Sequence, residues 1–249
     1  MIVTTDALIL KGMKYRETSR ILTMFTRDWG KVSLIAKGAR AQGSRFYGAL
    51  DPLSHVRMVM YKKDSRDLQF LSQCDLLDSH RTLSCSIEHM PFGLAVIELL
   101  NITTHQDETN IPLFDLTLQT LRAMNSATKN TVLALYYFEM KIIEILGFRP
   151  QLDRCAICGL GREEDEQFTM GFGGIVCSGC SSNAELNVSR PVVEMLRYLQ
   201  RTPSPQLALQ LELSPSLKTE VGNALRVFLQ HHIDGFRGLK SESVFASFV

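Results

Sequence analysis

The chain has 249 residues, of which 45% are hydrophobic and 21% are charged, and its formal net charge is +1. This hydrophobic fraction excludes a disordered chain, and the length allows one large domain or two modest ones. The longest apolar stretch, residues 132–148, contains charged residues and is too short for a bilayer-spanning helix. The first six residues lack the basic and apolar segments of a signal peptide, so we expect a cytoplasmic protein that does not associate with membranes.

The charge is unevenly distributed along the chain. Residues 1–66 contain 13 lysines and arginines against 5 acidic residues, or +8, whereas residues 67–249 contain 14 against 21, or −7. A basic segment joined to an acidic remainder is typical of a part that binds a polyanion such as nucleic acid. A solvated lysine-rich surface would give the same count, so charge alone leaves both interpretations open.

Five short strands are predicted in the first eighty residues, at 5–11, 20–26, 31–37, 55–61 and 67–73. Apolar and polar residues alternate clearly in the last three, as where Val32 and Leu34 alternate with Lys31 and Ser33. Short strands joined by turns predict a small closed barrel, and the connection after the third strand is the longest, as in a five-stranded OB barrel. We therefore expect residues 1–80 to form an OB-fold nucleic-acid-binding domain.

Basic side chains gather on this predicted barrel. OB folds bind oligonucleotides on their middle strands, between the first and fourth loops, and both of these loops are basic here. Single-strand sites combine a cationic track with aromatic rings. The long third connection adds Phe46 and Tyr47, although for any single ring we expect packing against the barrel rather than base stacking. The predicted DNA-binding residues are Lys14, Arg16, Lys31, Lys37, Arg40, Arg45, Arg57, Lys62 and Lys63.

From about residue 79 the spacing of apolar residues becomes helical. Pro91 divides the segment 82–105 into two pieces, because proline belongs in the first turn of a helix. Further helices are predicted at 110–125, 131–146, 189–201 and 214–233. We expect residues 81–249 to form an all-α domain, so that the whole chain is of the α+β class. The apolar tail 243–249 is expected to pack back onto this domain or to dock on a partner.

Two Cys-x-x-Cys pairs, Cys155 with Cys158 and Cys177 with Cys180, lie 18 residues apart within the helical region. Together they can supply four thiolates to one tetrahedral zinc ion. Reduced thiols and a redox pair are the alternatives, but a redox pair needs no second pair at this spacing. We therefore expect one structural Zn²⁺ per chain, bound in an inserted module over about residues 150–185, with its coordination closed to substrate.

Three further expectations concern the remaining chemistry. The acidic run 163–166 is predicted to be the exposed tip of a hairpin, and Cys74 and Cys85 are predicted to be small buried apolar residues. The sequence contains no P-loop, dinucleotide-binding, nucleophile-elbow or HExxH motif. We therefore expect no enzymatic activity and no small-molecule substrate.

Several short segments, in this order and spacing, carry a family resemblance: 23–26 (Thr-Met-Phe-Thr), 29–31 (Trp-Gly-Lys), 36–40 (Ala-Lys-Gly-Ala-Arg), 50–53 (Leu-Asp-Pro-Leu), 173–180 and 239–241 (Leu-Lys-Ser). The chain resembles the bacterial recombination mediator RecO family. The resemblance implies binding of single- and double-stranded DNA and annealing of complementary strands. It also implies loading of recombinase onto strands coated by single-strand-binding protein, and the partner RecR.

Two other functions stay open at this point. The first is a zinc-braced scaffold whose barrel binds protein, and the second is an OB-fold RNA-binding factor without a repair role. Salt-dependent DNA binding would distinguish a DNA-binding protein from the scaffold, and competition between RNA and DNA would distinguish it from the RNA-binding factor.

Overall fold

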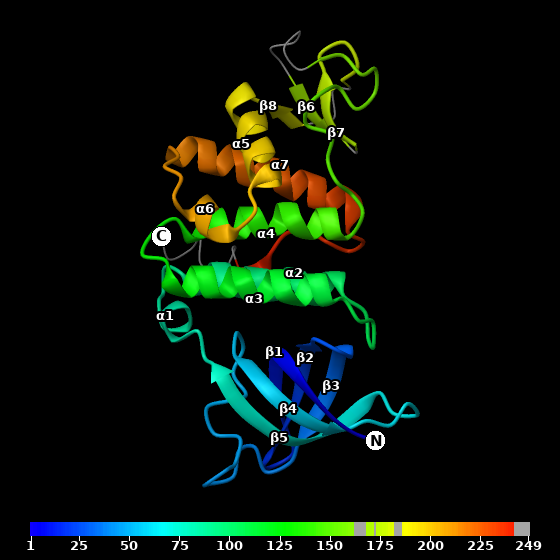
Figure 1. The fold of residues 1–249 in the computed structure, drawn as a ribbon, viewed down its shortest axis with the longest axis vertical. Coiled ribbons are helices and arrows are strands. Elements are labelled where there is room, and N and C mark those ends of the chain that lie inside the picture. Colours follow the sequence, from blue (N-terminus) through cyan, green and yellow to red (C-terminus); the bar gives the residue numbers. More distant parts are fainter. Residues whose placement is uncertain (162–167, 172, 182–185, 242–249) are drawn as a thin grey trace. The chain divides into compact units, whose positions relative to one another are not determined.

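A computed structural model describes residues 1–161, 168–171, 173–181 and 186–241. The N-terminal part of the chain forms a closed five-stranded barrel (Figure 1). The strand order around the barrel is β1-β2-β3-β5-β4, in which β3 and β5 pair in parallel and the other pairs are antiparallel. This closed barrel confirms the predicted fold. The strands are β1 (Ile2–Tyr15), β2 (Ser19–Thr26), β3 (Gly30–Ala36), β4 (His55–Tyr61) and β5 (Leu68–Asp78).

Strand β1 is longer than predicted because it pairs with two neighbouring strands, β4 and β2. Its first half pairs with β4 from Ile2 to Leu8, and its second half pairs with β2 from Ala7 to Tyr15. The register shifts between Ile9 and Lys11, as at a β-bulge. A bulge bends and twists a strand, which lets one strand close the barrel.

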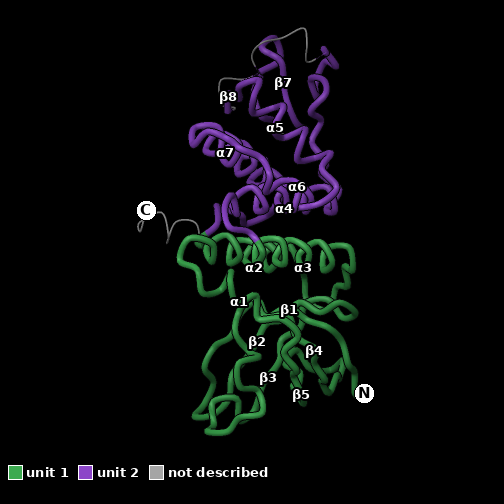
Figure 2. The backbone as a smooth tube through the Cα atoms, turned by 60° about the vertical axis from the view of Figure 1, so that its left-hand side comes forward, with its two compact units in different colours: residues 1–126, 240–249 green, residues 127–239 purple. Residues whose placement is uncertain are grey.

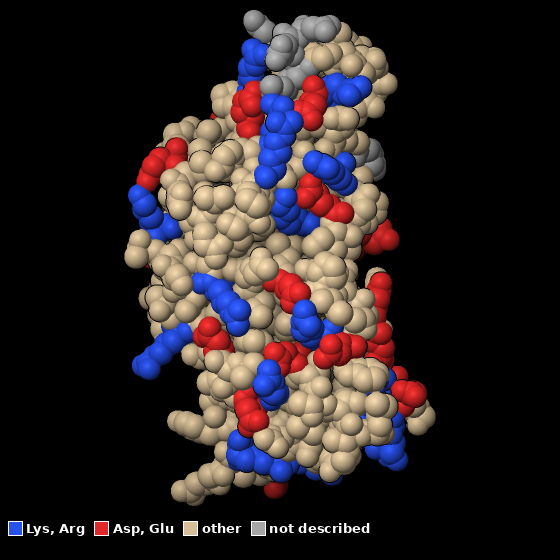
Figure 3. Space-filling view, in the orientation of Figure 1, with Lys and Arg blue, Asp and Glu red and all other residues tan. Residues whose placement is uncertain are grey.

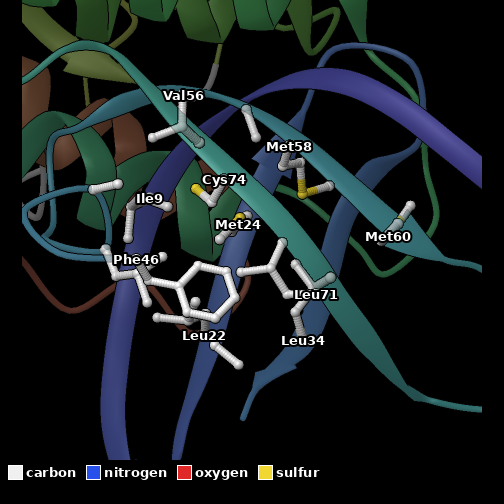
Figure 4. Close-up of a cluster of buried hydrophobic side chains, with 14 of the residues drawn as sticks. Ile9, Leu22, Met24, Leu34, Phe46, Val56, Met58, Met60, Leu71 and Cys74 are labelled. Carbon is white, nitrogen blue, oxygen red and sulfur yellow. The ribbon is translucent and has the colours of Figure 1, made fainter. Parts of the chain in front are cut away.

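Alternating side chains fill the barrel interior. Val32 and Leu34 of β3 are fully buried, whereas the residues between them are half-buried. Phe46, from the long connection between β3 and β4, joins the same core, and Figure 4 shows its ring among the labelled core side chains. The prediction that a ring of this connection packs on the barrel is therefore confirmed for Phe46. Tyr47 differs, because it is 94% exposed.

Three helices complete the first compact unit, which comprises residues 1–126 together with Lys240 and Ser241 of the described chain (Figure 2). They are α1 (Arg81–Ser84), α2 (Met90–Thr103) and α3 (Ile111–Ser126). Pro91 lies in the first turn of α2, as predicted. Phe114 of α3 packs against the Phe25 ring of β2, with 6.2 Å between ring centroids, and Arg27 forms an ion pair with Asp115.

The second compact unit, residues 127–239, contains helices and a small sheet (Figure 2). Its helices are α4 (Thr131–Ile145), α5 (Arg190–Arg201), α6 (Pro205–Leu209) and α7 (Pro215–His232). Most side chains of α4 are buried, so this helix lies in the core of the unit. The sheet has the order β7-β6-β8 and consists of β6 (Phe168–Gly171), β7 (Gly174–Cys177) and β8 (Leu186–Val188).

Some predictions differ from the structure or lie outside it. Cys74 is buried as predicted, but Cys85 is exposed because it follows the short helix α1 on the surface. The acidic run 163–166 and the tail 243–249 fall outside the described residues. The predicted division into a domain of residues 1–80 and a domain of residues 81–249 stays a prediction. In the described part of the chain, none of the helices combines the length and apolar character needed to cross a membrane.

Candidate metal centre and nucleic-acid surface

The four cysteines of the two Cys-x-x-Cys pairs meet at one point of the second unit. Their sulfur atoms all lie within 4.8 Å of one another, and the Sγ atoms of Cys158 and Cys177 are 3.6 Å apart. Tetrahedral zinc with Zn–S bonds of about 2.3 Å separates its sulfur ligands by about 3.8 Å. The cluster therefore has the ligand type and the spacing to hold one metal ion of this kind.

Backbone geometry builds the two halves of this cluster. Gly159 follows the first pair with φ +77°, a conformation that favours glycine, and its N–H donates to the carbonyl oxygen of Cys155. The N–H of Ala156 donates to the carbonyl oxygen of Ile175 in β7, which ties the first pair to the strand that ends in Cys177. The sulfurs are thus brought together by the polypeptide itself.

A close approach of two backbone segments supports this arrangement. Gly174, at φ +132°, lies so near to Gln151 that an added Cβ would be 2.1 Å from the Gln151 carbonyl oxygen. The N–H of Ile175 donates to that same oxygen, and the N–H of Gln151 donates to the carbonyl oxygen of Gly173. The chain arriving from α4 is therefore paired with β7 just before the first cysteine.

The electrostatics of the sulfurs favour a bound cation. Burial opposes ionisation of the Cys155 thiol, but N–H groups of Ile157 and Cys177, each 3.4 Å from the sulfur, help to lower its pKa to about 6. Hydrogen bonds with Cys158 and Cys177 raise the pKa of Cys180 to about 12. Neighbouring thiolates repel one another, so all four can ionise together only when a cation neutralises them.

The predicted DNA-binding cations fall into two groups in the structure. The first group is exposed and lies in or beside the loops of the barrel. Arg40 donates from Nη1 to the carbonyl oxygen of Glu17 at 3.1 Å, and the ammonium of Lys37 lies 5.5 Å from the centre of the Phe70 ring. The exposed group consists of Lys14, Arg16, Lys37, Arg40, Arg45 and Lys63.

Lys31, Arg57 and Lys62 form the second group, and each has an intramolecular polar partner, although the Arg57 side chain is 56% exposed. Lys31 is half-buried and donates from Nζ to the carbonyl oxygen of Asn101 at 2.8 Å, and burial lowers its pKa. Arg57 forms an ion pair with Asp6 at 2.8 Å. Lys62 is buried, with its Nζ 3.1 Å from Asp64 and 5.4 Å from the centre of the Trp29 ring.

These engagements could not be read from strand alternation. Alternation placed Arg57 on the outward face of its strand, but only the register of β1 with β4 places Asp6 opposite it. The partner of Lys31 comes from a helix seventy residues further along the chain. On the face shown in Figure 3, basic and acidic side chains are interspersed over the barrel. Five of the six exposed cations lie in loops, and Lys14 lies near the end of β1.

Comparison with known proteins gives a consistent result over nearly the whole chain. Residues 1–80 match the family model for the N-terminal part of recombination protein O, and residues 86–242 match the model for its C-terminal part. The chain is 29% identical over 245 residues to the DNA repair protein RecO of Bacillus pumilus, which covers 98% of this chain and 92% of the relative. It is 30% identical over 251 residues to the DNA repair protein RecO of Pelodictyon phaeoclathratiforme, covering 97% and 96%.

Proposed function

Because the chain belongs to the RecO family of DNA repair proteins, we propose that it is a non-catalytic DNA-binding mediator of recombinational repair. In this proposal the protein binds single- and double-stranded DNA, anneals complementary strands and helps to load recombinase onto strands coated by single-strand-binding protein. It acts in the bacterial cytoplasm, with RecR as a partner.

One observation carries the DNA-binding part of this proposal. Six of the nine predicted cations are exposed, five of them in the loops of a closed OB barrel and Lys14 near the end of β1, and within the described residues none of the six takes part in a salt bridge. Phosphates can therefore approach them without displacing a carboxylate. Lys31, Arg57 and Lys62 would have to break intramolecular interactions before they could bind phosphate. We therefore assign these three residues a smaller share of the contact with DNA.

Annealing follows from phosphate neutralisation. A surface that binds the backbones of two strands lowers their mutual repulsion, and complementary bases then pair without chemical assistance. Such an activity needs no catalytic group. Annealing needs several cations at once, because each cation contributes only a modest part of the binding free energy and salt screens that contribution.

We propose that the metal at Cys155, Cys158, Cys177 and Cys180 is one structural Zn²⁺ per chain. Four thiolates satisfy tetrahedral zinc and leave no position for water or substrate. The described strands around the cluster are short, so the metal would supply much of the folding free energy of this module.

The function is tested by titrating the full-length protein with single-stranded, duplex and RNA oligomers at two salt concentrations, and by following the annealing of two complementary strands. We expect binding to both DNA forms that weakens with salt, and faster annealing at protein concentrations that saturate the strands. Absence of DNA binding would favour the scaffold function. Clear preference for RNA over DNA would favour an RNA-binding factor.

A further inference from the structure

A row of four apolar side chains, two exposed and two half-buried, crosses four strands on the outer surface of the barrel. In the strand registers, Ile2 of β1 lies opposite Tyr61 of β4, Tyr61 lies opposite Phe70 of β5, and Phe70 lies opposite Ile35 of β3. Ile2 is 64% exposed and Tyr61 is 45% exposed, whereas Phe70 and Ile35 are half-buried. Residues paired across strands share one face of a sheet, so these four side chains form one row.

The inward side of the same strands confirms that this row points outward. Met60 precedes Tyr61 and lies opposite Leu71, which follows Phe70. Both Met60 and Leu71 are fully buried in the barrel core. Because side chains alternate between the two faces of a strand, Tyr61 and Phe70 belong to the outer face.

The two aromatic rings of the row are close neighbours. The ring centroids of Tyr61 and Phe70 are 5.8 Å apart, and the rings are tilted by 43°. The pair lies next to the turn of the β4–β5 hairpin, and in Figure 1 this turn, drawn in cyan, projects beyond the other strands. Because Tyr61 is 45% exposed and Phe70 is half-buried, the pair is partly accessible to an extended ligand.

The charges around the rings are suited to an anionic ligand. The ammonium of Lys37 lies 5.5 Å from the centre of the Phe70 ring, and exposed Lys63 follows Tyr61 by two positions. In the part of the chain that the structure describes, neither lysine is in a salt bridge. At the other end of the hairpin, Arg57 is neutralised by Asp6 and lies opposite Asp75. Free positive charge thus coincides with the rings.

We infer that Tyr61 and Phe70 form a base-stacking platform that binds single-stranded nucleic acid, with Lys37 and Lys63 neutralising the flanking phosphates. Accessible rings beside a cationic track are the combination that binds unpaired bases without regard to sequence. The inference rests on the proposed function and adds to it a preference for single strands, because the bases of a duplex are already stacked on one another. It also places the platform on β4 and β5, rather than on the middle strands β2 and β3 where OB folds commonly bind.

The test replaces both rings in the full-length protein, as Tyr61→Leu with Phe70→Leu. Leucine keeps apolar surface and removes the aromatic faces, and neither change alters the charge. We expect affinity for a single-stranded oligomer to fall on the order of ten- to a hundredfold, since stacking on one ring contributes a substantial share of the binding to each base. Affinity for duplex should change by less than about twofold, and the dependence of affinity on salt should stay the same.

An abasic oligomer of the same length and charge separates stacking from phosphate contact. Wild-type protein should bind the ordinary strand more tightly than the abasic strand, and the double variant should bind the two alike. Tyr198→Leu is the matched control, because Tyr198 is exposed to a similar degree, 42%, on α5. This control should behave as wild type. Tyr61→Trp keeps an aromatic face and should retain tight single-strand binding.

Phe70 is half-buried, so its replacement can also lower stability. The single variant Tyr61→Leu, at the more exposed ring, is therefore measured alongside, with unfolding midpoints for every variant. The inference is overturned if the leucine variants bind ordinary single strands as wild type does, in which case the exposed row would suit a protein surface instead. It is also overturned if the leucine substitutions weaken binding to ordinary and abasic strands by the same factor. A wild-type protein that binds no DNA would overturn the proposed function itself.

Discussion

At the scale of single residues, a buried histidine couples the fold of the first unit to pH. His55 begins β4 and is almost fully buried, and neither of its ring nitrogens has a hydrogen-bond partner in the described structure. Burial lowers the pKa of His55. The carboxylate of Asp6, 3.7 Å away, opposes this lowering, whereas Arg122 and His80 lower the pKa further. The carboxylate of Asp78 also opposes the lowering. The folded state therefore favours the neutral ring.

This shift predicts a loss of stability on acidification. A histidine binds a proton below about pH 6.5 when unfolded, whereas His55 resists that proton when folded. The stabilising contribution is present above the unfolded pKa and is lost as the pH falls below it. His55→Leu should therefore show a smaller fall in melting temperature than wild type between about pH 7.5 and pH 5.5. His105→Leu, at an exposed site, is the control, and equal falls in wild type and His55→Leu would contradict the prediction.

Gly30 is a second residue whose role depends on close contact. It has φ +64°, and an added Cβ would lie 2.0 Å from the carbonyl oxygen of Glu108. Gly43 has φ +70°, but nothing lies within 4 Å of its added Cβ. Gly30→Ala should lower the free energy of unfolding by about 3 kcal/mol or more, since the backbone of residue 108 must move. Gly43→Ala should cost about 1 kcal/mol. Equal losses of unfolding free energy in the two variants, measured by denaturant unfolding, would contradict this prediction. They would show that the backbone near residue 108 moves at little cost.

At the scale of elements, the sequence predicts a strand or helix best where one residue type or one hydrophobic period is enough to identify it. Alternation identified the inward residues of β3, and Pro91 marked the start of α2. Helix α6 was missed because its five residues are too few to display a helical period. The engagement of Lys31 and Lys62 was missed for a different reason. Asn101, the partner of Lys31, and Asp107, which pairs with Lys62 in addition to Asp64, follow the barrel in sequence, and only tertiary packing brings them to it.

The cysteine cluster gives the element-scale prediction. Protein purified without chelator should contain about one zinc per chain. Cys155→Ser should lose the metal and lower the melting temperature, whereas Cys74→Ser, at an equally buried cysteine outside the cluster, should keep it. A chelator should lower the melting temperature of wild type and of Cys74→Ser but not that of Cys155→Ser. Elemental analysis that finds no zinc in the wild-type protein would refute the assignment.

At the scale of the whole molecule, charge is unevenly distributed along the chain. The +8 balance of residues 1–66 falls within the barrel and its loops, and the −7 balance of residues 67–249 spreads over β5, the helices and the metal module. Most of this negative balance lies in the first unit, because residues 67–126 contain 2 basic against 8 acidic residues, whereas the second unit contains 11 against 12. A negative balance repels phosphate at long range, so we expect residues 67–249 to contribute to partners more than to DNA. The family is recognisable from the order of its parts, whereas the set of candidate DNA-binding cations becomes smaller only when their intramolecular partners are known.

The most direct measurement of the central claim is the salt dependence of DNA binding by the full-length double variant Lys37→Ala, Arg40→Ala. Both residues are exposed and lie at the start of the connection between β3 and β4. The matched control, Arg190→Ala with Arg237→Ala, removes two exposed cations from the second unit. If the barrel loops bind phosphates, the slope of log affinity against log salt flattens by roughly one to two for the first variant and stays at the wild-type value for the control. Unchanged affinity and slope in the Lys37→Ala, Arg40→Ala protein, with loss of binding in the control, would contradict the account.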